Sequence, residues 1–316
     1  MYGCSRRQVL FLPGRAGKNR TNAGTPRSQN QQYGAGMTVF APAKLNFSLQ
    51  ILGKREDGFH ELKTLMVPVA GLCDRLEINP SESFELETGN AEVGPVETNL
   101  VTRALRLFEQ STGRRCSYRI KLEKHIPSGA GLGGGSSDAA AVLRALNEVE
   151  KAGLGNAELE EMAALLGSDV PFFLRDSPCW CRGRGEVLEE TSLASQEVVL
   201  LKPAFSVNTV DAYRRWAEST DLAGVFYGPQ QVDDLQMIND LERPAFARFP
   251  FLAELKMWLL DRRGVKGAMM SGSGATVFAI LEKGVRATEL VGDARKELDP
   301  KLWWWAGSTS ASIRKD

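Results

Sequence analysis

Nine consecutive residues near the middle of the chain, 127–135, contain five glycines and lead directly into an amphipathic helical pattern over 136–150. Glycine tolerates positive φ and lets backbone N–H groups come close to a ligand, and the positive end of a helix adds to such an anion-binding nest. A flexible linker seldom leads straight into a well-patterned helix. The segment therefore predicts a phosphate-binding loop, to which Ser136 and Ser137 add hydroxyls for phosphate oxygens or a metal.

Two common phosphate loops do not fit this segment. A Walker loop requires a lysine directly after the glycines, and none is present. The dinucleotide-binding pattern GxGxxG occurs at Gly129, Gly131 and Gly134, but it requires a second parallel strand with an acid about 20 residues further on. Since 136–166 has the pattern of two consecutive helices, a third type of loop is favoured.

Strand and helix patterns alternate without the regular rhythm of βαβ units, which favours an α+β fold. Strands are predicted over 38–40, 45–52, 75–78, 117–122, 187–188, 198–201, 276–280 and 302–305. Helices are predicted over 99–111, 136–150, 156–166, 210–219, 240–244, 251–262 and 287–298. The helix at 156–166 is predicted to be capped by Asn156 and ended by Gly167, and a further helix is predicted to follow Ser168. A length of 316 residues predicts two domains, which we place at 37–195 and 196–316.

The first 36 residues differ from the rest, because they hold six basic residues and no acidic one. Their composition predicts a disordered extension, for which a transit peptide and a misassigned start before Met37 remain alternatives. The remaining residues carry 33 basic against 39 acidic side chains, which argues against nucleic-acid binding. No apolar run approaches the length of a membrane span, and five scattered cysteines indicate reduced thiols in a cytoplasmic protein.

Four segments, in the same order along the chain, resemble the GHMP small-molecule kinases. The ATP loop of that family resembles Pro127-Ser128-Gly129-Ala130-Gly131-Leu132-Gly133-Gly134-Gly135-Ser136-Ser137-Asp138-Ala139-Ala140. The other three are Ala41–Asn46 with Lys54–Leu62, Gly167–Phe173 and Ser271–Ala275. Phe59 stands where the family usually has tyrosine, and Ser273 where threonine is common. Four segments in family order are a specific match.

The resemblance implies a two-domain fold, with an N-terminal domain like ribosomal protein S5 and a ferredoxin-like C-terminal domain. It implies an ATP-dependent kinase that phosphorylates the 2-hydroxyl of a cytidine diphosphate derivative of methylerythritol in the non-mevalonate isoprenoid pathway. Mg²⁺ is expected to bridge the ATP phosphates, with no metal cage of the protein's own. ATP and this small molecule are the expected partners, with no membrane and no obligate protein partner.

The resemblance also assigns roles to single residues. Asp169 is the general base and Lys44 its partner, although from the sequence alone Asp169 could equally cap a helix. The substrate is assigned to Asn46, Phe59, His60, Thr209 and Tyr213. ATP is assigned to Asn99, Lys124, Pro127, Ser128, Gly129, Ala130, Gly131, Leu132, Gly133, Gly134, Gly135, Ser136 and Ser137.

Two alternatives stay open at this point. One is another GHMP kinase, of the homoserine or mevalonate type, which the Lys44-Leu45-Asn46 and Asp57-Gly58-Phe59-His60 strings disfavour. The other is a homologue that binds a nucleotide without catalysis, which the presence of both Lys44 and Asp169 disfavours.

Overall fold

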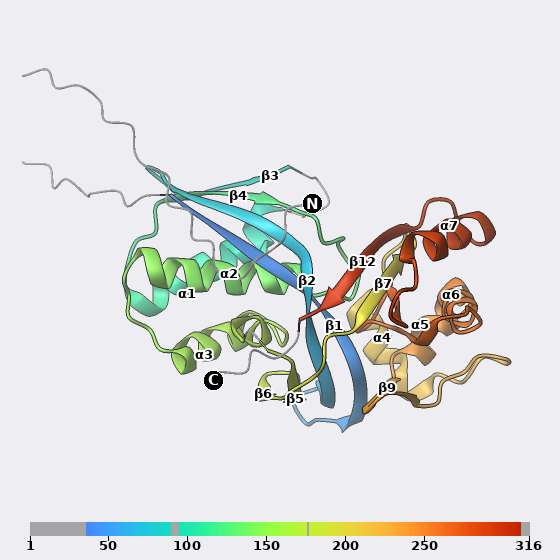
Figure 1. The fold of residues 1–316 in the computed structure, drawn as a ribbon. Helices are drawn as coiled ribbons and strands as arrows, with labels where there is room; N and C mark the ends of the chain where they lie inside the picture. The colour runs from blue at the N-terminus through green and yellow to red at the C-terminus, as the bar shows by residue number, and fades with distance from the viewer. Residues whose placement is uncertain (1–35, 90–94, 176, 311–316) are drawn as a thin grey trace, which may run out of the picture.

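The computed structural model describes residues 36–89, 95–175 and 177–310, so the extension predicted over 1–36 lies, apart from Gly36, outside the described residues. Two long antiparallel strands, β1 (Met37–Lys54) and β2 (His60–Pro80), run through the molecule (Figure 1). Helices α1, α2 and α3 lie on one side of this pair, and α4 to α7 lie on the other. None of the described helices has the length and apolar character needed to cross a membrane.

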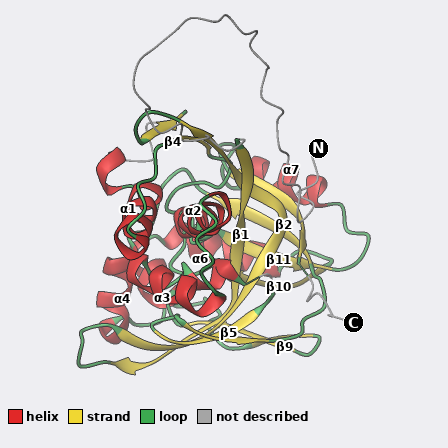
Figure 2. Ribbon diagram, turned by 90° about the vertical axis from the view of Figure 1, so that its left-hand side faces the viewer, coloured by secondary structure: helices red, strands yellow, loops and turns green. Residues whose placement is uncertain are grey.

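The first part of the chain packs three helices against the strands. These are α1 (Leu100–Thr112), α2 (Gly134–Val149) and α3 (Asn156–Leu166). Their apolar faces form one core with β1, β2 and β4 (Tyr118–Glu123), and the strands curve behind the helices in Figure 2. The short elements here are β3 (Glu85–Thr88), η2 (Val96–Thr98), η3 (Pro171–Leu174), β5 (Cys179–Gly183) and β6 (Val187–Glu190).

The second part begins with β7 (Glu197–Lys202), which pairs with β11 (Val277–Leu281) and with β12 (Trp303–Thr309). Its remaining strands are β8 (Gln230–Val232), β9 (Leu235–Asn239) and β10 (Val265–Met270). Its helices are α4 (Thr209–Arg215), η4 (Trp216–Glu218), α5 (Glu242–Arg248), α6 (Pro250–Leu260) and α7 (Ala287–Glu297).

The two parts share one sheet. Within the described residues its main path runs β10-β11-β7-β12-β2-β1-β9-β8, because β12 pairs with β2 and β9 pairs with β1. Most pairs are antiparallel, and no βαβ rhythm organises the described strands. The predicted α+β class is therefore confirmed. The run Trp303-Trp304-Trp305 lies in β12 and pairs with β7, so the strand predicted over 302–305 is confirmed.

Several predicted elements differ from the structure. The strands predicted over 38–40 and 45–52 are one strand with bulges beside Lys44 and Ser48, and the first half of β2 and all of β5 were not predicted. Residues 64–69 of β2 are buried on both faces and so lack the alternation that marks a strand in sequence, whereas β5 alternates but is only five residues long. The prediction that Asn156 caps a helix is wrong: Gly155 is the cap, and the Glu158 side chain accepts from its N–H at 2.7 Å. After Ser168 only the short η3 forms.

Candidate active site

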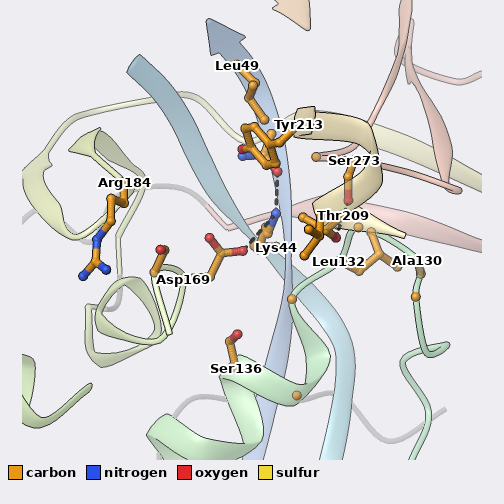
Figure 3. Close-up of a pocket in the computed structure, with 18 of the residues that line it drawn as sticks. Lys44, Leu49, Ala130, Leu132, Ser136, Asp169, Arg184, Thr209, Tyr213 and Ser273 are labelled. Carbon is orange, nitrogen blue, oxygen red and sulfur yellow. Dashed lines mark hydrogen bonds and ion pairs between the residues drawn. The ribbon is translucent and has the colours of Figure 1, made fainter. Parts of the chain in front are cut away.

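A cavity of about 1100 Å³ opens between the glycine loop, the β1–β2 pair and α4. Figure 3 shows the side chains that point into it, with Lys44 and Asp169 close together near its middle. All but one of the site residues predicted from the sequence line this cavity, although the chain positions run from 44 to 213. The exception is Ser137.

Lys44 lies on β1 and is almost fully buried, at 3% exposure. Its Nζ is 3.5 Å from Oδ2 of Asp169 and donates to Oδ1 of Asn46. The Asn46 amide donates in turn to Thr64 Oγ1 at 2.8 Å, and Thr64 donates to the Ser48 carbonyl at 2.6 Å. These bonds hold the ammonium beside the carboxylate. The β-bulges on both sides of this segment orient its side chains toward the cavity.

Asp169 follows the end of α3 and has a side chain that is one-third exposed. The helix-cap alternative can be tested here, because the next element, η3, has no side-chain cap and its N-cap residue is Val170. Among the described residues the partner of the carboxylate is Lys44. The geometry therefore places an ionisable acid and a buried cation together at the cavity wall, an arrangement suited to accepting a proton from a bound hydroxyl.

The glycine loop is held against the loop that follows β10. Gly131 has φ +74°, and a Cβ there would lie 2.1 Å from the Ser271 carbonyl oxygen. Ser271 Oγ donates to the Gly131 carbonyl at 3.0 Å, and the N–H of Thr276 donates to the Ala130 carbonyl at 3.2 Å. Helix α2 begins at Gly134, two residues earlier than predicted, so its N-terminal amides face the cavity.

The two serines at the start of α2 differ in position. Ser136 lines the cavity, whereas Ser137 is 1% exposed, lies outside the cavity wall and has a buried hydroxyl without a hydrogen-bond partner. Successive residues of a helix point in directions about 100° apart, which separates the two hydroxyls. Of the two, only Ser136 can reach a ligand in this arrangement.

Lys124 joins two buried carboxylates at one end of the cavity. Its Nζ donates to Asp74 and, at 2.7 Å, to Asp138. Burial raises the pKa of Asp138, with Asp74 adding to the effect and Lys124 opposing it. Burial alone would lower the pKa of Lys124, but the carboxylates of Asp138 and Asp74 outweigh it and raise the pKa. Nearby, Asn99 caps α1 by accepting from the Val101 N–H at 2.8 Å.

The opposite end of the cavity is aromatic. The His60 ring stacks on Tyr213 at 5.4 Å between centroids and meets the edge of Trp216 at 5.9 Å. Burial lowers the pKa of His60, and Lys54 adds to this effect. Thr209 shares a hydrogen bond of 2.8 Å with Ser273, which ties α4 to the loop after β10. Flat apolar rings around a neutral imidazole suit a planar base.

Sequence reasoning missed two side chains of this wall, Trp216 and Arg184. Trp216 follows Tyr213 by three residues and so shares its helical face, a spacing that could have indicated it. Arg184 lies in the turn between β5 and β6, with its guanidinium 4.7 Å from the centre of the Phe59 ring. In the sequence only the Gly183-Arg184-Gly185 string could have indicated this turn, because the strand before it, β5, was not predicted.

Comparisons with known proteins agree with this geometry. Residues 99–177 match the family model of the GHMP kinases N terminal domain, and residues 230–299 match that of the GHMP kinases C terminal domain. A relative from Methylacidiphilum infernorum, named 4-diphosphocytidyl-2-C-methyl-D-erythritol kinase, is 42% identical over 270 residues, which cover 84% of this chain and 93% of the relative. The chain belongs to the 4-diphosphocytidyl-2-C-methyl-D-erythritol kinase family.

Solved structures agree with this family. A crystal structure of 4-(cytidine 5'-diphospho)-2C-methyl-D-erythritol kinase is similar at a TM-score of 0.71 and 36% identity, covering 87% of this chain and 100% of that one. A homoserine kinase from Cytophaga hutchinsonii has a TM-score of 0.63 at 18% identity, covering 92% and 98%, and so shares the fold. The predicted two-domain GHMP kinase fold is confirmed, and a kinase of this family uses ATP.

Proposed function

We propose that this chain transfers the γ-phosphoryl group of ATP to the 2-hydroxyl of 4-diphosphocytidyl-2-C-methyl-D-erythritol, a step of the non-mevalonate isoprenoid pathway. The observation that carries the proposal is the Lys44–Asp169 pair, which lies at 3.5 Å in a cavity between a glycine loop and an aromatic wall. The glycine loop suits the phosphates of ATP, and the aromatic wall suits the cytosine. The acceptor hydroxyl then lies between them, beside the pair.

In this mechanism Asp169 accepts the proton of the 2-hydroxyl as the oxygen attacks the γ-phosphorus, and the bond from this phosphorus to the β–γ bridging oxygen breaks to release ADP. Lys44, whose ammonium lies 3.5 Å from that carboxylate, stabilises the charge that develops on the oxygen. Asn46, which accepts a hydrogen bond from Lys44, holds the ammonium in this position. The backbone N–H groups at the start of α2 bind the phosphates, as a helix N-terminus does for anions.

Mg²⁺ would be bound together with ATP and would supply positive charge to the phosphates. Within the described residues no group of three or more His, Cys, Asp or Glu side chains gathers around a point. The donors that line the cavity are hard oxygens, chiefly those of Ser136 and Asp169. They fit an ion that is held mainly by substrate phosphates and completed by one or two protein oxygens.

A product assay tests the proposed function. The purified chain is incubated with ATP and Mg²⁺ and, in parallel, with the cytidyl substrate, homoserine or mevalonate, and ADP and the phosphorylated product are measured. ADP release with the cytidyl substrate alone is expected, with the phosphate on the 2-oxygen. Turnover of homoserine or mevalonate instead would assign the chain to another GHMP activity, and no turnover with any of them would favour a nucleotide-binding homologue.

We also propose the setting and the division of the chain. One apolar core is formed by residues between 37 and 181, and a second mainly by residues between 199 and 302, which supports domains at 37–195 and 196–316.

We propose that the kinase works in the cytoplasm, which suits the buried free thiols of Cys116, Cys179 and Cys181, and that it needs no protein partner for turnover.

A further inference from the structure

Arg184, in the turn between β5 and β6, is a positively charged residue at the end of the cavity proposed to bind the cytidyl substrate. Arg184 lines this cavity, and its guanidinium lies over one face of the half-exposed Phe59 ring, 4.7 Å from the centroid. Its Nε forms an ion pair with Oε1 of Glu186 at 3.6 Å, a distance too long for a hydrogen bond. No residue that the structure describes accepts a hydrogen bond from the guanidinium, so its donors are available to a ligand.

The position of Arg184 is set by contacts on both sides of the turn. The N–H of Arg184 donates to Glu186 Oε2 at 2.6 Å, and that of Gly183 donates to Glu61 Oε1 at 3.1 Å. Gly185 has φ +121°, and a Cβ there would lie 3.5 Å from the carbonyl oxygen of Ser168, the residue before Asp169. The turn therefore has the Arg184 guanidinium over Phe59 and Gly185 against Ser168, the residue before the proposed general base.

The other basic side chains of the cavity wall have different neighbours. Lys44 is paired with Asp169, Lys124 is hydrogen-bonded to two carboxylates, and Arg214 donates to Asp211. Lys54 is at the end of β1, opposite His60. Arg184 is the cation whose guanidinium makes no hydrogen bond within the described structure and whose neighbour in the chain, Gly185, lies against Ser168, the residue preceding Asp169.

We propose that Arg184 binds the diphosphate of the cytidyl substrate, with Phe59 as the support that positions its guanidinium. This rests on the proposed function. The diphosphate joins the cytidine to the methylerythritol, so a substrate with its base near His60 and its hydroxyl near Asp169 has its diphosphate between them. A guanidinium offers a planar fork of donors that matches phosphate oxygens. One face of Phe59 holds the guanidinium, which leaves the other face for the base.

Binding of cytidine, CMP and CDP, measured by titration calorimetry with a non-hydrolysable ATP analogue saturating the ATP end, tests the proposal. The wild-type chain should bind CDP more tightly than cytidine. Arg184→Met should weaken CDP binding by about 10-fold, which is about 1.4 kcal/mol, and leave cytidine binding unchanged, because only CDP loses charge-assisted hydrogen bonds to its phosphates. Arg184→Lys should recover part of the CDP affinity. In turnover, Arg184→Met should raise KM for the cytidyl substrate and leave KM for ATP unchanged.

Arg182→Met is the matched control, because Arg182 is exposed on the same hairpin, two residues earlier, and does not line the cavity. It should keep the CDP preference. If Arg184→Met weakened the binding of cytidine and of CDP equally, the proposal would be overturned. It would also be overturned if Lys54→Met removed the preference for CDP while Arg184→Met kept it. A wild-type chain that binds none of the three ligands but phosphorylates homoserine or mevalonate would overturn the proposed function itself.

Discussion

Asp169 and Lys44 are 125 residues apart in sequence and 3.5 Å apart in space, and each has a different solvent environment. The lysine is buried and held by Asn46, whereas the carboxylate is one-third exposed and can meet a substrate. Both side chains line the cavity, but the carboxylate is the more accessible of the two. In the proposed mechanism the proton therefore moves to Asp169.

Asp169→Asn should therefore lower kcat by about 10²–10⁴-fold, the usual contribution of a general base, with KM for ATP and the unfolding temperature unchanged. Lys44→Ala should also lower kcat strongly, and the double variant should be barely slower than Asp169→Asn, because both residues act on one proton transfer. Steady-state kinetics and thermal unfolding measure this. Near-normal turnover in a stable Asp169→Asn chain would disprove the catalytic assignment.

His60 should titrate below 6.5, because burial and the nearby Lys54 disfavour its charged form. A lowered pKa in the folded state means that the fold favours the neutral ring. Its contribution to stability is thus present above about pH 6.5 and lost as the pH falls through the lowered pKa. The chain has two histidines, so proton NMR of His125→Gln follows His60 alone. A midpoint at or above 6.5 would contradict the burial of this ring.

At the scale of elements, the glycine loop and the loop after β10 form one unit. The carbonyls of Gly129, Ala130 and Gly131 each accept a hydrogen bond from residues 271–276. The second loop is anchored in turn by Asn239, whose amide donates to the carbonyls of Met270 and Gly272 at 2.7 and 2.8 Å. The phosphate-binding loop thus depends on residues from the far end of the chain.

Gly131→Ala should raise KM for ATP by about 10-fold or more and lower the free energy of unfolding, because its Cβ would clash with the Ser271 carbonyl. Gly153→Ala is the matched control: it has the same φ of +74° but no atom within 4 Å of a Cβ. Gly153→Ala should lower the free energy of unfolding only by the backbone strain, about 1–2 kcal/mol, and leave KM for ATP unchanged. Equal effects of the two substitutions on KM would rule out the contact with Ser271 as the cause.

Helices α5 and α6 are joined by a fully buried ion pair, Glu242–Lys256, at 2.6 Å. Glu242 also accepts from the Met270 N–H at 2.9 Å, just before the loop that meets the phosphate-binding loop. Glu242→Gln should cost about 3–5 kcal/mol of unfolding free energy, because it leaves the buried lysine with a hydrogen bond to the Phe226 carbonyl but without a counter-charge. Adding Lys256→Met should recover part of the loss. Urea unfolding measures both. A double variant no more stable than the single one would contradict this account.

The described part of the molecule is organised around β1 and β2 (Figure 1), which contribute to each of three apolar cores and to the wall of the cavity. Because β12, near the end of the described residues, pairs with β2, the two parts cannot separate without breaking the sheet. The cavity therefore depends on the folding of the complete sheet. Residues before 36 lie outside this described framework.

A chain that starts at Met37 should accordingly keep full activity, because the core begins at Met37 and residues 1–36 lack apolar periodicity. Turnover and the unfolding temperature of this shortened chain are compared with those of the full chain. Loss of more than half of the turnover would mean that the extension contributes to the enzyme.

Local patterns in the sequence determined the phosphate loop, the helix after it and the other long amphipathic helices, because backbone freedom at glycine and helical periodicity are properties of neighbouring residues. The segments around Lys44, His60 and Asp169 were indicated only by resemblance to a family. The tertiary structure alone decided that Ser137 lies outside the cavity, that Gly155 rather than Asn156 caps α3, and that Arg184 reaches Phe59. These features depend on burial and on contacts between distant segments, such as the pairing of β5 with β2, which no local pattern encodes.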